Sequence, residues 1–111
     1  MEYEEKRDMV YELLDLLKEN KLNEVQKQTI KNIVKGLKNR TEKQKERFYM
    51  FYNLLESESK NYRLCDMAEL YNCTSSCIKF SISRIRNNLI NDDESNLAIM
   101  KKILNEYHNK N

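Results

Sequence analysis

The chain has no proline and a single glycine among its 111 residues. These two residues form most tight turns and interrupt helices, so their scarcity argues against a fold rich in turns. Leucine, isoleucine, lysine and glutamate are abundant, and all of them are compatible with helices. The composition and length therefore predict an all-α fold, a small helical domain of about six helices with short loops.

Long apolar runs are also missing. No segment approaches the length of a membrane span, and the N-terminus lacks the apolar stretch of a signal peptide. We therefore expect a cytoplasmic protein that does not contact a membrane. There is no glycine-rich phosphate loop, and the single histidine, His108, stands in no recognisable order with a reactive serine or cysteine. The sequence thus predicts that the protein is not an enzyme and that it has no catalytic residue and no cofactor.

Cysteine is scarce as well. Cys65, Cys73 and Cys77 are an odd number without a C-x-x-C pair, and a fourth zinc ligand would have to be the distant His108. One hypothesis is that the three thiols approach one another in a metal or redox site. The interpretation we favour is that they are small apolar fillers between packed helices, so no metal site is predicted.

The net charge of +2 is too small for a strong nonspecific binder of polyanions, but it is unevenly spread. Residues 1–20 carry 3 basic and 7 acidic side chains, whereas residues 21–50 carry 9 basic and 3 acidic ones. This asymmetry predicts separate surfaces for different partners.

Apolar residues recur with helical spacing along the whole chain. Helices are expected over about 3–20 and 23–37, from residue 41 onward, over the two segments described next, and after Asp92 and Asp93. Asn23, Thr41 with Gln44, and the two aspartates are the expected N-caps. A loop is expected at 56–61. We expect residues 1–38 to form an N-terminal helical hairpin and residues 39–111 a second unit. The residues expected to face inward include Val10, Leu13, Leu14, Leu17, Ile30, Ile33, Val34, Leu37, Phe48, Phe51, Tyr52, Leu55, Leu97, Ile99, Met100, Ile103, Leu104 and Tyr107.

The segment 63–89 has the pattern of two short helices joined by a tight turn. Asn72 is suited to a left-handed turn residue, and Thr74 and Ser75 are good N-caps for the second helix. The expected inward residues are Leu64, Met67, Ala68 and Tyr71 in the first helix and Ile78, Ile82, Ile85 and Leu89 in the second. The other side of the second helix is polar and basic. This is the pattern of a DNA-reading helix-turn-helix, and a generic packed helix pair is the alternative.

A Thr-capped helix with Thr41, Gln44, Lys45 and Phe48 precedes this segment. Together, residues 41–89 resemble region 4 of the bacterial sigma-70 family. The matching positions beyond residue 48 are Leu64, Asp66, Met67, Ala68, Tyr71, Cys73, Thr74, Ile78, Lys79, Arg84 and Leu89. The chain departs from the family pattern at Arg40, Asn72, Ser75, Ser76 and Phe80. The resemblance therefore extends to the fold of this unit and not to a base preference.

The resemblance implies a DNA-binding transcription regulator whose helix 74–89 reads a promoter element. Ser75, Ser76, Lys79 and Phe80 stand at the positions of base contacts, although packing of Phe80 against another helix is an equal alternative. The expected DNA-binding residues are Arg63, Thr74, Ser75, Ser76, Lys79, Phe80, Ser83, Arg84 and Arg86. Double-stranded DNA is the first implied partner and RNA polymerase the second.

Two questions stay open at this point. The chain is either a DNA binder or a helical protein-interaction module that binds RNA polymerase or a sigma factor without binding DNA. The strong apolar stripes of the first and last helices either close the core of one chain or form the seam of a homodimer.

Overall fold

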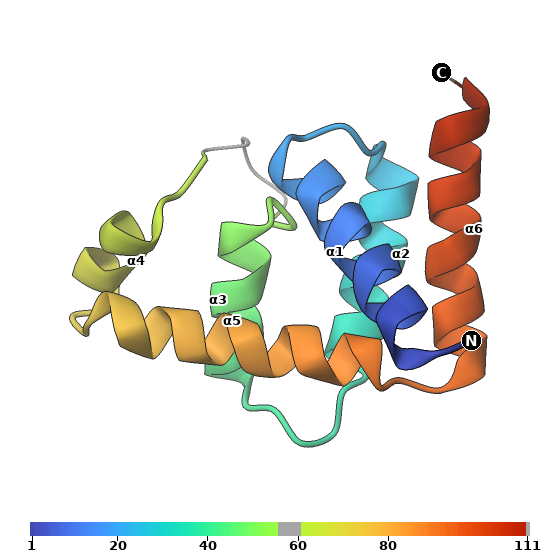
Figure 1. Ribbon diagram of the computed structural model, residues 1–111. Coiled ribbons are helices and arrows are strands. Elements are labelled where there is room, and N and C mark those ends of the chain that lie inside the picture. Colours follow the sequence, from blue (N-terminus) through green and yellow to red (C-terminus); the bar gives the residue numbers. More distant parts are fainter. Residues whose placement is uncertain (56–60, 111) are drawn as a thin grey trace.

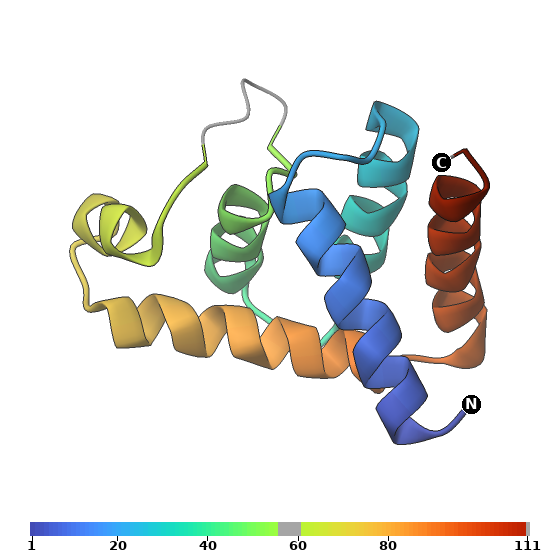
Figure 2. The ribbon, with the colours of Figure 1, turned by 45° about the horizontal axis from the view of Figure 1, so that its top comes forward.

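The computed structural model describes residues 1–55 and 61–110, and these residues form six α-helices and no strand. The helices are α1 (Tyr3–Lys18), α2 (Glu24–Lys35), α3 (Glu42–Phe51), α4 (Leu64–Leu70), α5 (Ser75–Ile90) and α6 (Glu94–Lys110). The predicted all-α fold of about six helices is confirmed. Helix α5 runs along one side of the molecule, and α4 and α6 lie at its opposite ends in both views (Figures 1 and 2). Of the expected loop 56–61, all but Asn61 lies outside the described residues.

The helix starts follow from local side-chain chemistry. The side chain of Asn23 accepts a hydrogen bond from the backbone N–H of Gln26 at 2.8 Å, and Thr41 accepts one from Gln44 at 3.1 Å. In both pairs the glutamine side chain accepts a bond from the N-cap backbone in return. The predicted caps at these two positions are confirmed, since each satisfies N–H groups that the first helical turn leaves open.

The ends of the first two helices differ from the prediction by about two residues. Helix α1 ends at Lys18 and α2 at Lys35, instead of near 20 and 37, and α3 ends at Phe51, before the loop that was expected at 56–61. Asn20 and Asn53 follow α1 and α3 with left-handed φ angles of 57° and 61°, a conformation that asparagine tolerates and that ends a helix. The spacing of apolar residues continues through these turns, which is why the sequence overestimates the lengths of the helices.

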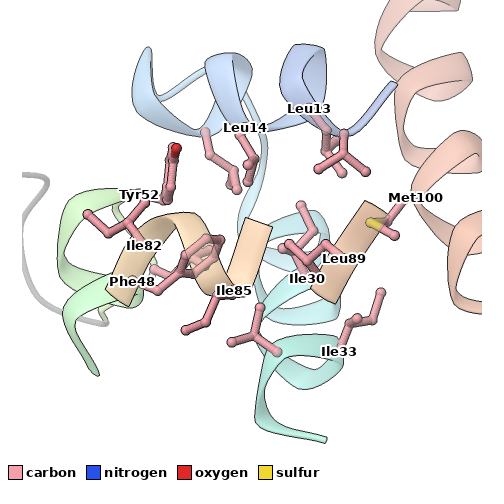
Figure 3. Packing of buried hydrophobic residues seen from close by; sticks show 14 of the residues in the cluster. Leu13, Leu14, Ile30, Ile33, Phe48, Tyr52, Ile82, Ile85, Leu89 and Met100 are labelled. Carbon is pink, nitrogen blue, oxygen red and sulfur yellow. The ribbon is translucent and has the colours of Figure 1, made fainter. Parts of the chain in front are cut away.

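One buried cluster contains side chains from all six helices. Side chains from α1, α2, α3, α5 and α6, with Tyr52 at the end of α3, meet in this cluster (Figure 3). The residues labelled there are Leu13, Leu14, Ile30, Ile33, Phe48, Tyr52, Ile82, Ile85, Leu89 and Met100. Residues from both 1–38 and 39–111 thus share a core, and the proposed division at residue 38 stays a prediction.

The apolar stripes of α1 and α6 are used inside the chain. Helix α1 packs against α5 and α6, and α2 packs against α3 and α6. The stripe residues, none more than 6% exposed, are Leu13, Leu14, Leu17, Leu97, Met100 and Leu104. Side chains that are already buried within one chain are not available as the seam of a homodimer. Core closure therefore accounts for these buried residues, and a homodimer stays a prediction.

Two residues that were expected to face inward do not. Leu55 and Ile99 are each 38% exposed. Leu55 lies beyond the end of α3, where helical spacing no longer determines which way a side chain points. The helix turns by about 100° per residue, so Ile99 lies on α6 beside the face that Leu97 and Met100 bury, and not within it.

Two polar side chains join the end of α1 to the end of α3. The side-chain amide of Asn53 donates to the carbonyls of Leu17 at 3.1 Å and Lys18 at 3.2 Å. The ammonium of Lys18 donates to the carbonyls of Phe51 at 2.9 Å and Tyr62 at 2.7 Å, and it lies 3.7 Å from the centroid of the Phe51 ring. Burial lowers the pKa of Lys18. These bonds place Tyr62, and hence the start of α4, relative to α1 and α3.

We expect Asn53→Ala to lower the free energy of unfolding by about 2–4 kcal/mol. The variant loses both hydrogen bonds, although the Leu17 carbonyl keeps the bond from the N–H of Asn20, and alanine is strained at a left-handed φ. Asn53→Gly loses the same bonds without that strain, so its expected loss is smaller by about 1 kcal/mol. Urea denaturation of the three proteins measures both differences. Equal losses for the two variants would contradict a contribution from the backbone conformation.

Candidate nucleic-acid interface

The helices α4 and α5 are joined by the tight turn that the sequence predicted. Asn72 has a left-handed φ of 52°, and the N–H of Cys73 donates to the carbonyl of Ala68 at 3.0 Å, which closes the end of α4. Thr74 is the N-cap of α5, and its hydroxyl accepts the N–H of Cys77 at 3.2 Å. Ser75, the other candidate cap, is the first residue of α5.

This pair of helices rests on α3. Helix α4 packs against α3 and α5, and α3 packs along α5. The buried side chains that join the three helices include Phe48 from α3, Met67 and Ala68 from α4, and Ile78, Ile82 and Ile85 from α5. The predicted inward faces of both helices are confirmed at these positions. Leu64 and Tyr71 are half-buried, because they lie at the two ends of the short α4.

A buried arginine that sequence reasoning missed fixes the relation of α3 to α5. Arg47 is 8% exposed and donates to the hydroxyl of Ser81 at 3.0 Å. Its guanidinium carbon lies 5.0 Å from the centroid of the Tyr71 ring, and the Tyr71 hydroxyl donates to Glu46 at 2.6 Å. Burial and the bond to the Glu46 carboxylate raise the pKa of Tyr71, so this hydroxyl remains a donor. No local sequence pattern distinguishes Arg47 from a solvated arginine.

The outer side of α5 is polar and is not covered by another helix. Ser75, Ser76, Lys79 and Phe80 are exposed, as the prediction of a contact surface requires. Phe80 is 59% exposed and therefore does not pack against another helix. The guanidinium of Arg84 lies 4.8 Å from the centroid of its ring instead, so the arginine stacks on the phenylalanine.

Three other predicted contact residues, Arg63, Ser83 and Arg86, have partners within the protein. Arg63 is at the far end of α4 from the turn and forms an exposed ion pair with Asp66 at 3.2 Å. Ser83 is half-buried and its hydroxyl accepts a bond from Arg86 at 3.0 Å.

Arg86 also lies 5.6 Å from the centroid of the Tyr11 ring in α1, and its charge opposes the rise in the pKa of Tyr52 that burial causes. Arg86 is therefore directed toward α1 and the end of α3. It is not grouped with Lys79 and Phe80.

Two of the three cysteines are not fillers of the core, whereas Cys73 packs against it. Cys65 and Cys77 are exposed and Cys73 is half-buried, so the expectation of buried spacers is wrong for the first two. Each lies at an end of its helix, where the neighbouring helix no longer covers it. No group of three or more His, Cys, Asp or Glu side chains in residues 1–55 and 61–110 is arranged to hold a metal ion.

Comparison of the chain with protein-family models, with curated proteins and with solved structures finds no match. None of the helices in the described part of the chain combines the length and apolar character that crossing a membrane requires.

Proposed function

We propose that the protein is a DNA-binding transcription regulator that reads a promoter element with α5. The observation that carries this proposal is the uncovered outer side of α5, where Ser75, Ser76, Lys79 and Phe80 are exposed around a helix start. Lysine can donate to guanine in the major groove, serine hydroxyls bond to several bases, and an aromatic ring can contact the thymine methyl. The proposal is that the first two turns of α5 enter the groove and make these contacts.

The charge of α5 supports the same conclusion. Its sixteen residues include Lys79, Arg84 and Arg86 and no acidic side chain, whereas α1 carries several glutamates and aspartates. With Arg86 directed toward α1, the cations expected near phosphates are Arg84 and Arg63, and Lys79 is expected at base edges. A contact with RNA polymerase is a further part of the proposal, and it rests on the resemblance of residues 41–89 to sigma region 4.

One observation favours the alternative of a protein-interaction module. Leu70 is 63% exposed at the end of α4, and Phe80 is 59% exposed on α5. Exposed apolar patches are typical of protein contact surfaces, although single exposed apolar side chains are common. Under this alternative the same face would bind RNA polymerase or a sigma factor, and the protein would not bind duplex DNA.

The salt dependence of duplex binding separates the two functions. Each neutralised phosphate contributes a slope of about −0.9 to the plot of log affinity against log salt, so the two arginines give about −1.8. We expect this slope when a duplex selected from a random pool is titrated with the protein at several salt concentrations.

The test variant and its matched control each lose two positive charges. Lys79→Ala with Arg84→Ala is expected to lower the affinity and, through the loss of Arg84 from a phosphate, to reduce the slope by about one unit. Lys101→Ala with Lys102→Ala changes exposed lysines of α6, at the other end of the molecule, and should leave the slope unchanged. No duplex binding at low salt would contradict the DNA proposal and favour the protein-interaction module. Equal effects of the two pairs would show that α5 is not the binding surface.

A further inference from the structure

The arginine that precedes α3 is attached to the side of α5. Arg40 comes directly before the N-cap Thr41, and its Nε atom donates to the side-chain oxygen of Asn88 in α5 at 2.6 Å. Its Nη1 atom donates to the carbonyl of Asn39. The Nη2 atom makes no hydrogen bond with any of residues 1–55 and 61–110. The guanidinium of this half-buried arginine is therefore held in place, and part of it stays available to an outside acceptor.

The charge of Arg40 has no carboxylate partner in the described part of the chain. Arg7 pairs with Asp8 at 3.3 Å and Arg63 with Asp66 at 3.2 Å, whereas both acceptors of Arg40 are neutral oxygens. A guanidinium held by neutral groups keeps its positive charge uncompensated. Its N–H donors also lie in a fixed planar fork, which is the geometry that binds phosphate.

Two carboxylates line the cleft on the other side of Asn88, and both accept bonds at the start of α6. Asp92 accepts the N–H of Asp93 at 2.8 Å and the side-chain amide of Asn96 at 3.1 Å. Asp93 accepts the N–H of Asn96 at 2.9 Å. These carboxylates serve the turn between α5 and α6, and neither forms an ion pair with Arg40 in the described part of the chain.

Asn88 belongs to a row of side chains along one side of α5. Phe80, Arg84 and Asn88 are spaced by four residues, so each lies about one helical turn beyond the last. Arg84 lies on the ring of Phe80, and Arg40 is bonded to Asn88 at the next turn. Two guanidiniums are thus placed along the same side of α5. One belongs to α5 and the other is brought there by the segment before α3.

We propose that Arg40 binds a phosphate of the DNA backbone, beside the phosphate bound by Arg84. This inference rests on the proposed function and extends the contact surface from α5 to the segment before α3. Arg40 is a position at which the chain departs from the sigma region 4 pattern, so the resemblance assigns it no such role. Asn88 is a positioning residue, which holds the guanidinium. The contact orients α5 on the duplex without reading its sequence.

The salt dependence of duplex binding tests the contact. One phosphate more than Arg84 and Arg63 provide changes the expected slope of log affinity against log salt from about −1.8 to about −2.7. Between about 50 and 200 mM salt, the affinity of the unmutated protein should fall about 40-fold and that of Arg40→Ala only about 12-fold. Arg40→Gln, which keeps a side-chain amide and loses the charge, should match Arg40→Ala. A selected duplex and a scrambled one should show the same change.

Two further variants separate the contact from a general effect of charge or of packing. Arg7→Ala removes the same side chain from α1, where Asp8 accompanies it, and should leave the slope unchanged. Asn88→Ala keeps every charge, so its slope should also stay near −2.7, as the three phosphate contacts remain. Its affinity should fall by about 2- to 12-fold, because the side chain of Arg40 must then be ordered on binding. Thermal melting followed by circular dichroism checks that each variant is folded.

The outcomes distinguish this inference from the proposed function. If the unmutated protein shows no salt-dependent binding to either duplex, the proposed function and this inference are both wrong. If it binds with a slope that Arg40→Ala and Arg40→Gln share, the contact of Arg40 alone is refuted and the proposed function stands. An unchanged affinity of Asn88→Ala would refute the positioning role of Asn88.

Discussion

Replacing Leu17 or Met100 by glutamate is expected to unfold the protein at 25 °C. Both side chains are completely buried, in α1 and α6 respectively. Removing such a side chain costs about 2–5 kcal/mol through lost burial. Leaving an unpaired carboxylate in its place costs several kcal/mol more. Since small domains are stable by about 5–15 kcal/mol, the two contributions together remove most or all of the stability.

The matched control for this experiment is Val25→Glu. Val25 is 76% exposed in the first turn of α2, so the same introduced charge should change the stability by less than about 0.5 kcal/mol. Thermal melting followed by circular dichroism and sedimentation velocity measure folding and association together. The contrary result is a wild-type protein that sediments as a dimer and a Leu17→Glu or Met100→Glu variant that is a folded monomer. The stripe that carries the substitution would then be a seam between two chains, and its burial within one chain would be refuted.

Lys79→Ala and Arg84→Ala are expected to weaken DNA binding in different ways, if the proposed function holds. Lys79 is exposed near the start of α5, where base edges are expected, so its loss should cost about 1–3 kcal/mol on a preferred sequence and relax the preference there. Arg84 is half-buried, lies further along and stacks on Phe80. Its loss should weaken binding to all sequences about equally and make the salt slope shallower by about one unit.

Competition between a selected duplex and a scrambled one measures this difference for each variant. Arg86→Ala is the matched control because Arg86 belongs to the same helix and carries the same charge, but is directed toward Tyr11. We expect Arg86→Ala to lower the melting temperature of the protein and to have little effect on its DNA affinity. Equal losses for Lys79→Ala on both duplexes would show that Lys79 does not read sequence and that α5 does not enter the groove as proposed.

The parts of the structure that the sequence predicted well depend on neighbouring residues. The caps at Asn23, Thr41 and Thr74 involve residues three positions apart, and the left-handed Asn72 depends on its own side chain. The helix-turn-helix unit follows from such local features together with the spacing of Ile78, Ile82 and Ile85. Helical periodicity likewise identified the buried stripes of α1 and α6. It could not decide whether another helix of the same chain covers them.

The residues that sequence reasoning missed have partners far along the chain. Lys18 bonds to the carbonyl of Tyr62, 44 residues away, and Arg47 bonds to Ser81, 34 residues away. The linear sequence contains no signal for such pairs, because they exist only once the helices have packed. Burial of a charged side chain is also exceptional, so the sequence favoured a solvated position for Arg47.

The amino-acid sequence by itself determined the all-α class, the approximate positions of the helices, their caps and the tight turn between α4 and α5. These features arise from interactions within a few residues or from a regular spacing. Only the tertiary structure decided that Arg86 of α5 lies against Tyr11 of α1, and that Arg47 of α3 bonds to Ser81 of α5. The physical reason is that these partners belong to different helices and come within reach only when the helices pack, whereas Arg84 and Phe80 lie four residues apart on one face of α5.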